Sequence, residues 1–193
     1  MRFIGFYSYT VILTYISLIS GILGVLFSIR GDLGCSVVCL GISGFCDMFD
    51  GLVARTKKNR TADEKNFGIQ IDSLCDVVCF GVLPAIYLYC SGLDTPWGIA
   101  IALFYALCAV IRLAFFNVIE TKRQQKEDGC AKYYRGLPVT TSAIFFPAVF
   151  LTGLFLQENV LLIIHHILPV VMGVLFILDF RVPKPDLGKL FHK

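Results

Sequence analysis

Four aspartates lie within or beside apolar segments of the sequence, at spacings that suit metal binding. Asp47 and Asp50 are three residues apart, and Asp72 and Asp76 are four apart, so on helices each pair shares one face. An ionised carboxylate at membrane depth costs roughly 2.5–3.5 kcal/mol, and the only basic residue on the same helical faces is Arg55. We therefore expect divalent cations to neutralise the aspartates. Oxygen ligands without histidine or cysteine favour Mg²⁺ or Mn²⁺.

The elements that must carry these aspartates are hydrophobic helices. Of the 193 residues, 56% are hydrophobic, and the mean hydropathy is +0.75; this indicates an integral membrane protein. A bilayer core of about 30 Å requires roughly 20 apolar residues per helix. We predict an all-α bundle of six transmembrane helices that forms a single domain, residues 1–193. The six apolar stretches are about 8–29, 34–54, 70–90, 97–118, 138–157 and 160–179.

Lysines and arginines collect on one side of this predicted bundle. Of the 17, all but Arg30 and Arg112 fall in the N-terminus, the segments 55–69 and 119–137, and the tail. The positive-inside rule then places both termini and the aspartates at the cytoplasmic side of the cytoplasmic membrane. The net charge of +3 fits this topology and attraction to anionic lipid, and we expect no nucleic-acid partner. The 8 cysteines show no metal or disulfide pattern.

The aspartates belong to a longer pattern that covers two predicted helices. It reads DxxDGxxAR, a spacer, then GxxxDxxxD, at Asp47, Asp50, Gly51, Ala54, Arg55, Gly68, Asp72 and Asp76. This pattern resembles the signature of the CDP-alcohol phosphatidyltransferases, which are membrane enzymes with six helices, usually dimeric. Three further stretches resemble the phosphatidylserine synthase branch of that family: FGIQIDSLCDVVCFGVLPA, RLAFFNV and YYRGLPVTTSA. One departure is Ser17, where that branch commonly has an asparagine.

The resemblance implies a homodimeric enzyme of phospholipid biosynthesis that transfers the phosphatidyl group of CDP-diacylglycerol to L-serine and releases CMP. It implies two ions, Mg²⁺ or Mn²⁺, held by the four aspartates, with Asp76 also the general base that takes the proton of the attacking hydroxyl. Gly51 and Arg55 would hold the CDP moiety, and Gly68 would leave room for the diphosphate. Close packing of helices is the alternative explanation for each glycine.

Two arginines are candidates for binding the acceptor. Arg112 lies well inside an apolar stretch and binds either the serine carboxylate or a structural partner, which would be an aspartate or a backbone carbonyl. Arg135 binds a phosphate or the serine carboxylate, or it is simply solvated. Within the family, transfer to glycerol 3-phosphate or an inositol phosphate is the alternative, although phosphorylated acceptors call for more basic residues than Arg112 alone. Outside it, the alternative is an ion-coupled membrane transporter, which would need neither the DG nor the AR element.

Overall fold

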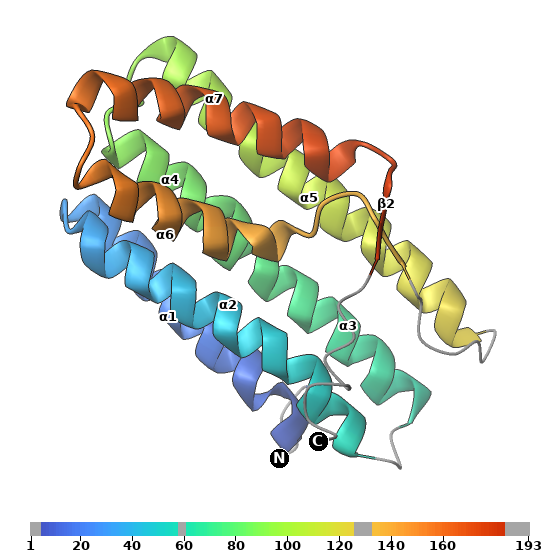
Figure 1. Ribbon diagram of the computed structural model, residues 1–193. Helices are drawn as coiled ribbons and strands as arrows, with labels where there is room; N and C mark the ends of the chain where they lie inside the picture. Colours follow the sequence, from blue (N-terminus) through green and yellow to red (C-terminus); the bar gives the residue numbers. More distant parts are fainter. Residues whose placement is uncertain (1–4, 58–60, 126–132, 184–193) are drawn as a thin grey trace, which may run out of the picture.

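The protein is a bundle of long helices that run roughly side by side, with one short two-stranded ribbon (Figure 1). The computed structural model describes residues 5–57, 61–125 and 133–183, without the side chains at 54–55, 122–125, 133–135 and 181–183. The helices are α1 (Ile12–Ile29), α2 (Leu33–Thr56), α3 (Ala62–Asp76), α4 (Leu83–Cys90), α5 (Pro96–Gln125), α6 (Ser142–Gly153) and α7 (Glu158–Ile177). Short 3₁₀ turns, Tyr9–Val11 and Val139–Thr141, precede α1 and α6, a π-helical segment, Val77–Val82, joins α3 to α4, and the strands are β1 (Tyr133–Arg135) and β2 (Arg181–Pro183).

Length and hydropathy agree with a membrane bundle. Within the described ranges, five stretches are long and apolar enough to cross a membrane: Tyr9–Ile29, Leu33–Val53, Ala62–Cys90, Pro96–Thr121 and Glu158–Ile177. A sixth apolar stretch, Val139–Gly153, is shorter. The predicted all-α membrane bundle of about six helices is therefore confirmed. The fifth predicted stretch, 138–157, is too long, because α6 ends at Gly153 and the chain turns before α7.

Polar caps set where α2 and α3 begin. Asp32 caps α2, and the amide of Cys35 donates to its Oδ1 (3.0 Å), which lowers the pKa of this carboxyl below its usual value. Helix α3 begins at Ala62, not near 70 as hydropathy predicts. A capping box starts it: the amide of Glu64 donates to the Thr61 hydroxyl (3.1 Å), and the amide of Thr61 donates to the Glu64 carboxylate (3.2 Å). Such a box satisfies amides that have no partner within the helix, so the helix extends into polar sequence.

Helix α1 packs closely against α2 and the third span through small and hydroxyl-bearing residues. Ser20 donates to the carbonyl of Cys39 on α2 (2.9 Å). A Cβ on Gly21 would lie 2.6 Å from the sulfur of Cys79 in the π-helical segment, so only glycine fits there. Small residues and interhelical hydrogen bonds are the usual basis of helix association in a membrane, where lipid offers no hydrophobic driving force.

The third span, α3 through α4, is continuous but changes its winding around Pro84. Proline has no amide hydrogen to donate within a helix, and the carbonyl of Phe80 accepts from the hydroxyl of Tyr105 on α5 instead (2.9 Å). Tyr105 is fully buried and packs edge-on against Phe146 of α6. One side chain of α5 thus supports the π-helical segment Val77–Val82 from the core of the bundle.

The two strands tie the segment before α6 to the segment after α7 (Figure 1). They are antiparallel, with Tyr133 opposite Pro183. Gly136 follows β1 with a φ of +71°, and its amide donates to the carbonyl of Phe180 (2.7 Å). A Cβ at Gly136 would lie 2.9 Å from the carbonyl oxygen of Leu178, so glycine is required for both reasons. The sequence did not predict this ribbon.

Candidate active site

Three of the four aspartates come together between α2 and α3. Asp47 and Asp50 project from α2 and Asp72 from α3, and one carboxylate oxygen of each lies within 4.8 Å of the others. We call these residues the aspartate cluster. Helical spacing and topology predict that the face with Asp47 and Asp50 can meet the face with Asp72; in the structure these three carboxylates come together.

Asp76 lies one turn beyond Asp72, outside the aspartate cluster. It is the last residue of α3 and only 7% exposed. The negative charges of Asp47, Asp72 and Asp50 all act on it, so it belongs to the same electrostatic environment. The π-helical segment starts at the next residue. Single π turns inside α-helices are frequent at functional sites, and here the altered winding directly follows a predicted catalytic side chain.

Helix α1 forms hydrogen bonds to both spans that carry the aspartates, a role that the sequence did not predict. Ser17 donates to the carbonyl of Ser43 (3.3 Å), and Ser43 donates back to the carbonyl of Ser17 (3.0 Å). The thiol of Cys79 also donates to the carbonyl of Ser17 (3.3 Å). Ser43 lies one turn before Asp47 on α2, and Cys79 lies three residues after Asp76. Ser17 therefore makes contacts between helices where the related branch commonly has asparagine.

A second residue of α1 contacts the aspartate cluster itself. The hydroxyl of Thr14 donates to Oδ2 of Asp50 (3.2 Å), and both side chains are almost completely buried. The signal in the sequence was the spacing of Thr10, Thr14 and Ser17, which places three hydroxyl side chains on one face of an apolar stretch. Without α2 beside it, that stripe resembles ordinary helix packing.

The aspartate cluster fits a hard divalent cation. Oδ1 of Asp72 is buried and accepts no hydrogen bond from any described residue. A buried carboxylate oxygen in this state is costly unless a donor or a cation satisfies it. The cluster offers carboxylate oxygens only, which are the ligands that Mg²⁺, Mn²⁺ and Ca²⁺ prefer. These three acids can therefore hold a metal ion.

The structure shows the surroundings of the two glycines of the predicted site, but not the side chains of two of its arginines. A Cβ added to Gly51 would meet no atom within 4 Å among the described residues, so close helix packing does not explain this glycine. Gly68 is half-buried on α3. The side chains of Arg55 and Arg135 lie outside the part of the chain that the structure describes.

Arg112 is buried in α5, with 6% of its surface exposed. Its Nε donates to the carbonyl of Leu137 (3.3 Å), and its guanidinium lies 5.9 Å from the centre of the Phe116 ring. A backbone carbonyl is one of the structural partners predicted for this residue. Arg112 also lines a cavity of about 190 Å³ between α5 and the end of α7, together with Phe115 and Asp179. The space beside the arginine is therefore large enough for a small ligand.

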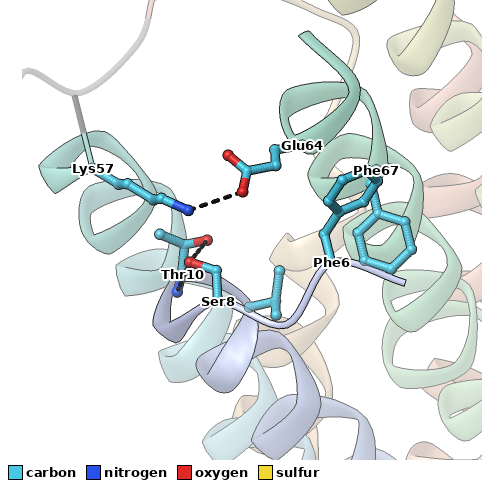
Figure 2. Close-up of a pocket in the computed structure, with 7 residues that line it drawn as sticks. Phe6, Ser8, Thr10, Lys57, Glu64 and Phe67 are labelled. Atoms are coloured by element: carbon cyan, nitrogen blue, oxygen red, sulfur yellow. Dashed lines mark hydrogen bonds and ion pairs between the residues drawn. The ribbon is translucent and has the colours of Figure 1, made fainter. Parts of the chain in front are cut away.

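The N-terminal segment, the end of α2 and the start of α3 contact one another around a small pocket (Figure 2). Phe6 lies edge-on to Phe67 of α3, with ring centres 5.6 Å apart. The ammonium of Lys57 pairs with the Glu64 carboxylate (3.0 Å), so the residue after α2 is joined to the capping box of α3. The cavity between these residues is about 10 Å³, room for a single water. These contacts set the separation of α2 and α3 at their polar ends.

Comparison with known proteins identifies one family that matches most of the chain. The sequence model of the family described as CDP-alcohol phosphatidyltransferase matches residues 9–177, a range that contains all four aspartates. No solved structure matches the chain significantly.

Curated relatives are similar over different shares of the chain. The archaetidylserine synthase of Methanothermobacter thermautotrophicus is 31% identical over 91% of this chain and 69% of its own length. The CDP-diacylglycerol–serine O-phosphatidyltransferase of Methanocaldococcus jannaschii is 31% identical over 89% of this chain and 71% of its own length. The enzyme of the same name from Saccharomyces cerevisiae is 38% identical, over 51% of this chain and 35% of its own length.

Proposed function

The chain belongs to the CDP-alcohol phosphatidyltransferase family, and we propose that it transfers the phosphatidyl group of CDP-diacylglycerol to L-serine, giving phosphatidylserine and CMP. The names of relatives from archaea and yeast support serine as the acceptor. The observation that carries the proposal is the aspartate cluster, because the acids of the family pattern meet from two helices and leave a buried carboxylate oxygen unsatisfied.

In this proposal the aspartates divide the chemistry between them. Asp47, Asp50 and Asp72 hold the cation, Asp76 completes the shell, and Arg55 contacts a phosphate of the CDP moiety. When bound, Mg²⁺ or Mn²⁺, two ions by family resemblance, offset the diphosphate charge and polarise the phosphorus under attack. Asp76 takes the proton of the serine hydroxyl as its oxygen bonds to the phosphatidyl phosphorus, and the bond from that phosphorus to CMP breaks.

Two glycines would make room for the donor. The open space beside Gly51 supports an approach of the CDP moiety to the backbone of α2. Gly68, on α3, would leave room for the diphosphate from the other side.

The acceptor would bind beside a buried arginine. Arg112 is the one buried arginine or lysine among the described residues, and a single cation suits the carboxylate of serine better than the phosphate of glycerol 3-phosphate or an inositol phosphate. The cavity beside Arg112 supports this role, whereas its bond to the Leu137 carbonyl supports a structural one. Arg135 is the second candidate, for a phosphate or the serine carboxylate.

The membrane arrangement is also part of the proposal. The chain forms a single domain in the cytoplasmic membrane, and the positions of the lysines and arginines support an orientation with both termini and the aspartate cluster at the cytoplasmic side. Family resemblance supports a homodimer.

The direct test is CMP release by the purified protein in detergent with Mg²⁺ or Mn²⁺. CDP-linked lipids with ester-linked or ether-linked tails are each offered with serine, glycerol 3-phosphate and inositol phosphate in turn, and Asp50→Asn, which lacks one proposed metal ligand, serves as the control with reduced release. We expect CMP release and a serine-containing lipid with serine only. Release of CMP with a phosphorylated acceptor, but not with serine, would refute serine as the acceptor. If a folded protein released no CMP with any acceptor or lipid, the proposed transferase activity would be refuted.

A further inference from the structure

Thr14 is the described side chain of α1 that donates a hydrogen bond to the aspartate cluster. Its hydroxyl lies 3.2 Å from Oδ2 of Asp50, and Thr14 is 4% and Asp50 9% exposed. We propose that Thr14 is a positioning residue for the metal site: its hydroxyl holds the Asp50 carboxylate in the orientation in which it joins Asp47 and Asp72. This inference rests on the cation site of the proposed function. It gives α1 a role in that site, although the predicted metal ligands all lie on α2 and α3.

A neutral donor suits this position for an electrostatic reason. Three carboxylates within 4.8 Å of one another repel, and a hydrogen bond to an ionised oxygen offsets part of that cost. A lysine or arginine in the place of Thr14 would offset more, but it would also cancel the negative charge that attracts a cation. The hydroxyl of a threonine stabilises the carboxylate and leaves the charge of the cluster intact.

The hydroxyl is held firmly enough to orient its partner. In a helix the branched Cβ of threonine leaves mainly two χ1 rotamers, and the hydrogen bond to Asp50 selects one of them. One turn further along α1, Ser17 and Ser43 exchange hydrogen bonds between α1 and α2, which fixes the position of Thr14 relative to Asp50. Partners that hydrogen-bond to metal ligands commonly have a 10–100-fold effect, as an order of magnitude, on metal affinity or activity.

The chain supplies a matched control one turn earlier. Thr10 is as buried as Thr14, at 4% exposed, but its hydroxyl donates to Ser8 (3.2 Å) and to no carboxylate among the described residues. Loss of a buried threonine hydroxyl is therefore common to the variants Thr10→Val and Thr14→Val. Only the second of them removes a bond to the aspartate cluster.

The experiment measures Mn²⁺ binding by electron paramagnetic resonance to the purified protein in detergent, without substrate. Thr14→Val is expected to weaken Mn²⁺ binding about ten-fold or more, whereas Thr14→Ser and Thr10→Val stay close to the wild type. CMP release by Thr14→Val should recover at high Mn²⁺, because the ligands themselves remain. Thermal unfolding without metal checks each fold, and Thr14→Ala replaces Thr14→Val if the valine does not fit.

Unchanged Mn²⁺ binding in a folded Thr14→Val or Thr14→Ala, or an equal loss in Thr10→Val, would overturn the inference. A wild type that binds no Mn²⁺ would overturn both the inference and the metal site of the proposed function. A wild type that binds Mn²⁺ but releases no CMP would refute the proposed function alone, since the comparison of Thr14 with Thr10 depends on binding and not on turnover.

Discussion

Asp76 is the residue at which proton transfer and metal binding can be separated. The variant Asp76→Asn keeps the size of the side chain and removes its charge and its ability to take a proton. Asp76 lies outside the aspartate cluster, whereas Asp50 lies within it. The two variants Asp76→Asn and Asp50→Asn should therefore fail in different ways, although both remove one buried carboxylate.

The expected magnitudes follow from these positions. A general base contributes about 10²–10⁴-fold to a rate, which corresponds to roughly 2.7–5.4 kcal/mol of transition-state stabilisation. We expect Asp76→Asn to reduce CMP release by that factor at any Mn²⁺ concentration. Its Mn²⁺ binding should weaken by less than about ten-fold, because the cluster keeps its three members. Asp50→Asn should weaken Mn²⁺ binding by about 100-fold or more, beyond the range for supporting partners.

The assay measures CMP release and Mn²⁺ binding on the same preparations, with thermal unfolding as the check on folding. Added Mn²⁺ separates the two defects, since it should partly restore a variant with weak binding and leave a variant without its base inactive. Near wild-type CMP release by Asp76→Asn would refute the assignment of the base. Loss of Mn²⁺ binding as severe as that of Asp50→Asn would show instead that Asp76 is a ligand of equal weight.

Three further predictions address packing, the acceptor and the topology. Tyr105→Phe leaves the Phe80 carbonyl without its donor and should lower the melting temperature by roughly 2–10 °C; an unchanged melting curve would mean that another group satisfies this carbonyl. Arg112→Lys should raise the KM for serine about ten-fold, because lysine loses the two-pronged geometry, whereas lower thermal stability with an unchanged KM would support the structural role. Lys65 and Asp94 are both exposed, and each can be replaced by cysteine once reactive native cysteines are removed. An impermeant label should reach position 65 only from the cytoplasmic side and position 94 only from the outer side. The reverse pattern would contradict the proposed orientation.

The parts of the site that the sequence predicts depend on local properties. The spacing of Asp47 and Asp50 along a helix and the cost of acids in apolar segments can both be evaluated from neighbouring residues. So can the hydropathy that predicted the membrane bundle, and the pattern that identified the family. Topology predicted that Asp72 could meet the α2 pair, because the second predicted helix ends and the third begins at the cytoplasmic side; which carboxylates meet depended on how α3 packs beside α2.

Most of the missed features depend on distant partners. Thr14 and Ser17 serve the site only because α2 lies against them, and their types alone are equally typical of helix packing. The early start of α3 is the exception, because the capping box of Thr61 and Glu64 is local and was missed only because hydropathy does not detect it. The support of the Phe80 carbonyl by α5 joins segments far apart in the chain.

The short stretch Val139–Gly153 has a consequence for the surrounding lipid. Its 3 residues of 3₁₀ turn and the 12 residues of α6 extend roughly 24 Å, at about 2.0 Å and 1.5 Å per residue, respectively, compared with a hydrocarbon core of about 30 Å. Leu154 and Phe155, 65% and 91% exposed, continue the apolar surface past the end of the helix and cover part of the difference. Local thinning of the bilayer, snorkelling of flanking residues or oligomerisation accommodates the remainder, at a cost that grows with each ångström of mismatch. The protein should therefore be easier to accommodate in membranes with shorter acyl chains, and the thickness of the host bilayer becomes a variable in any reconstitution of its activity.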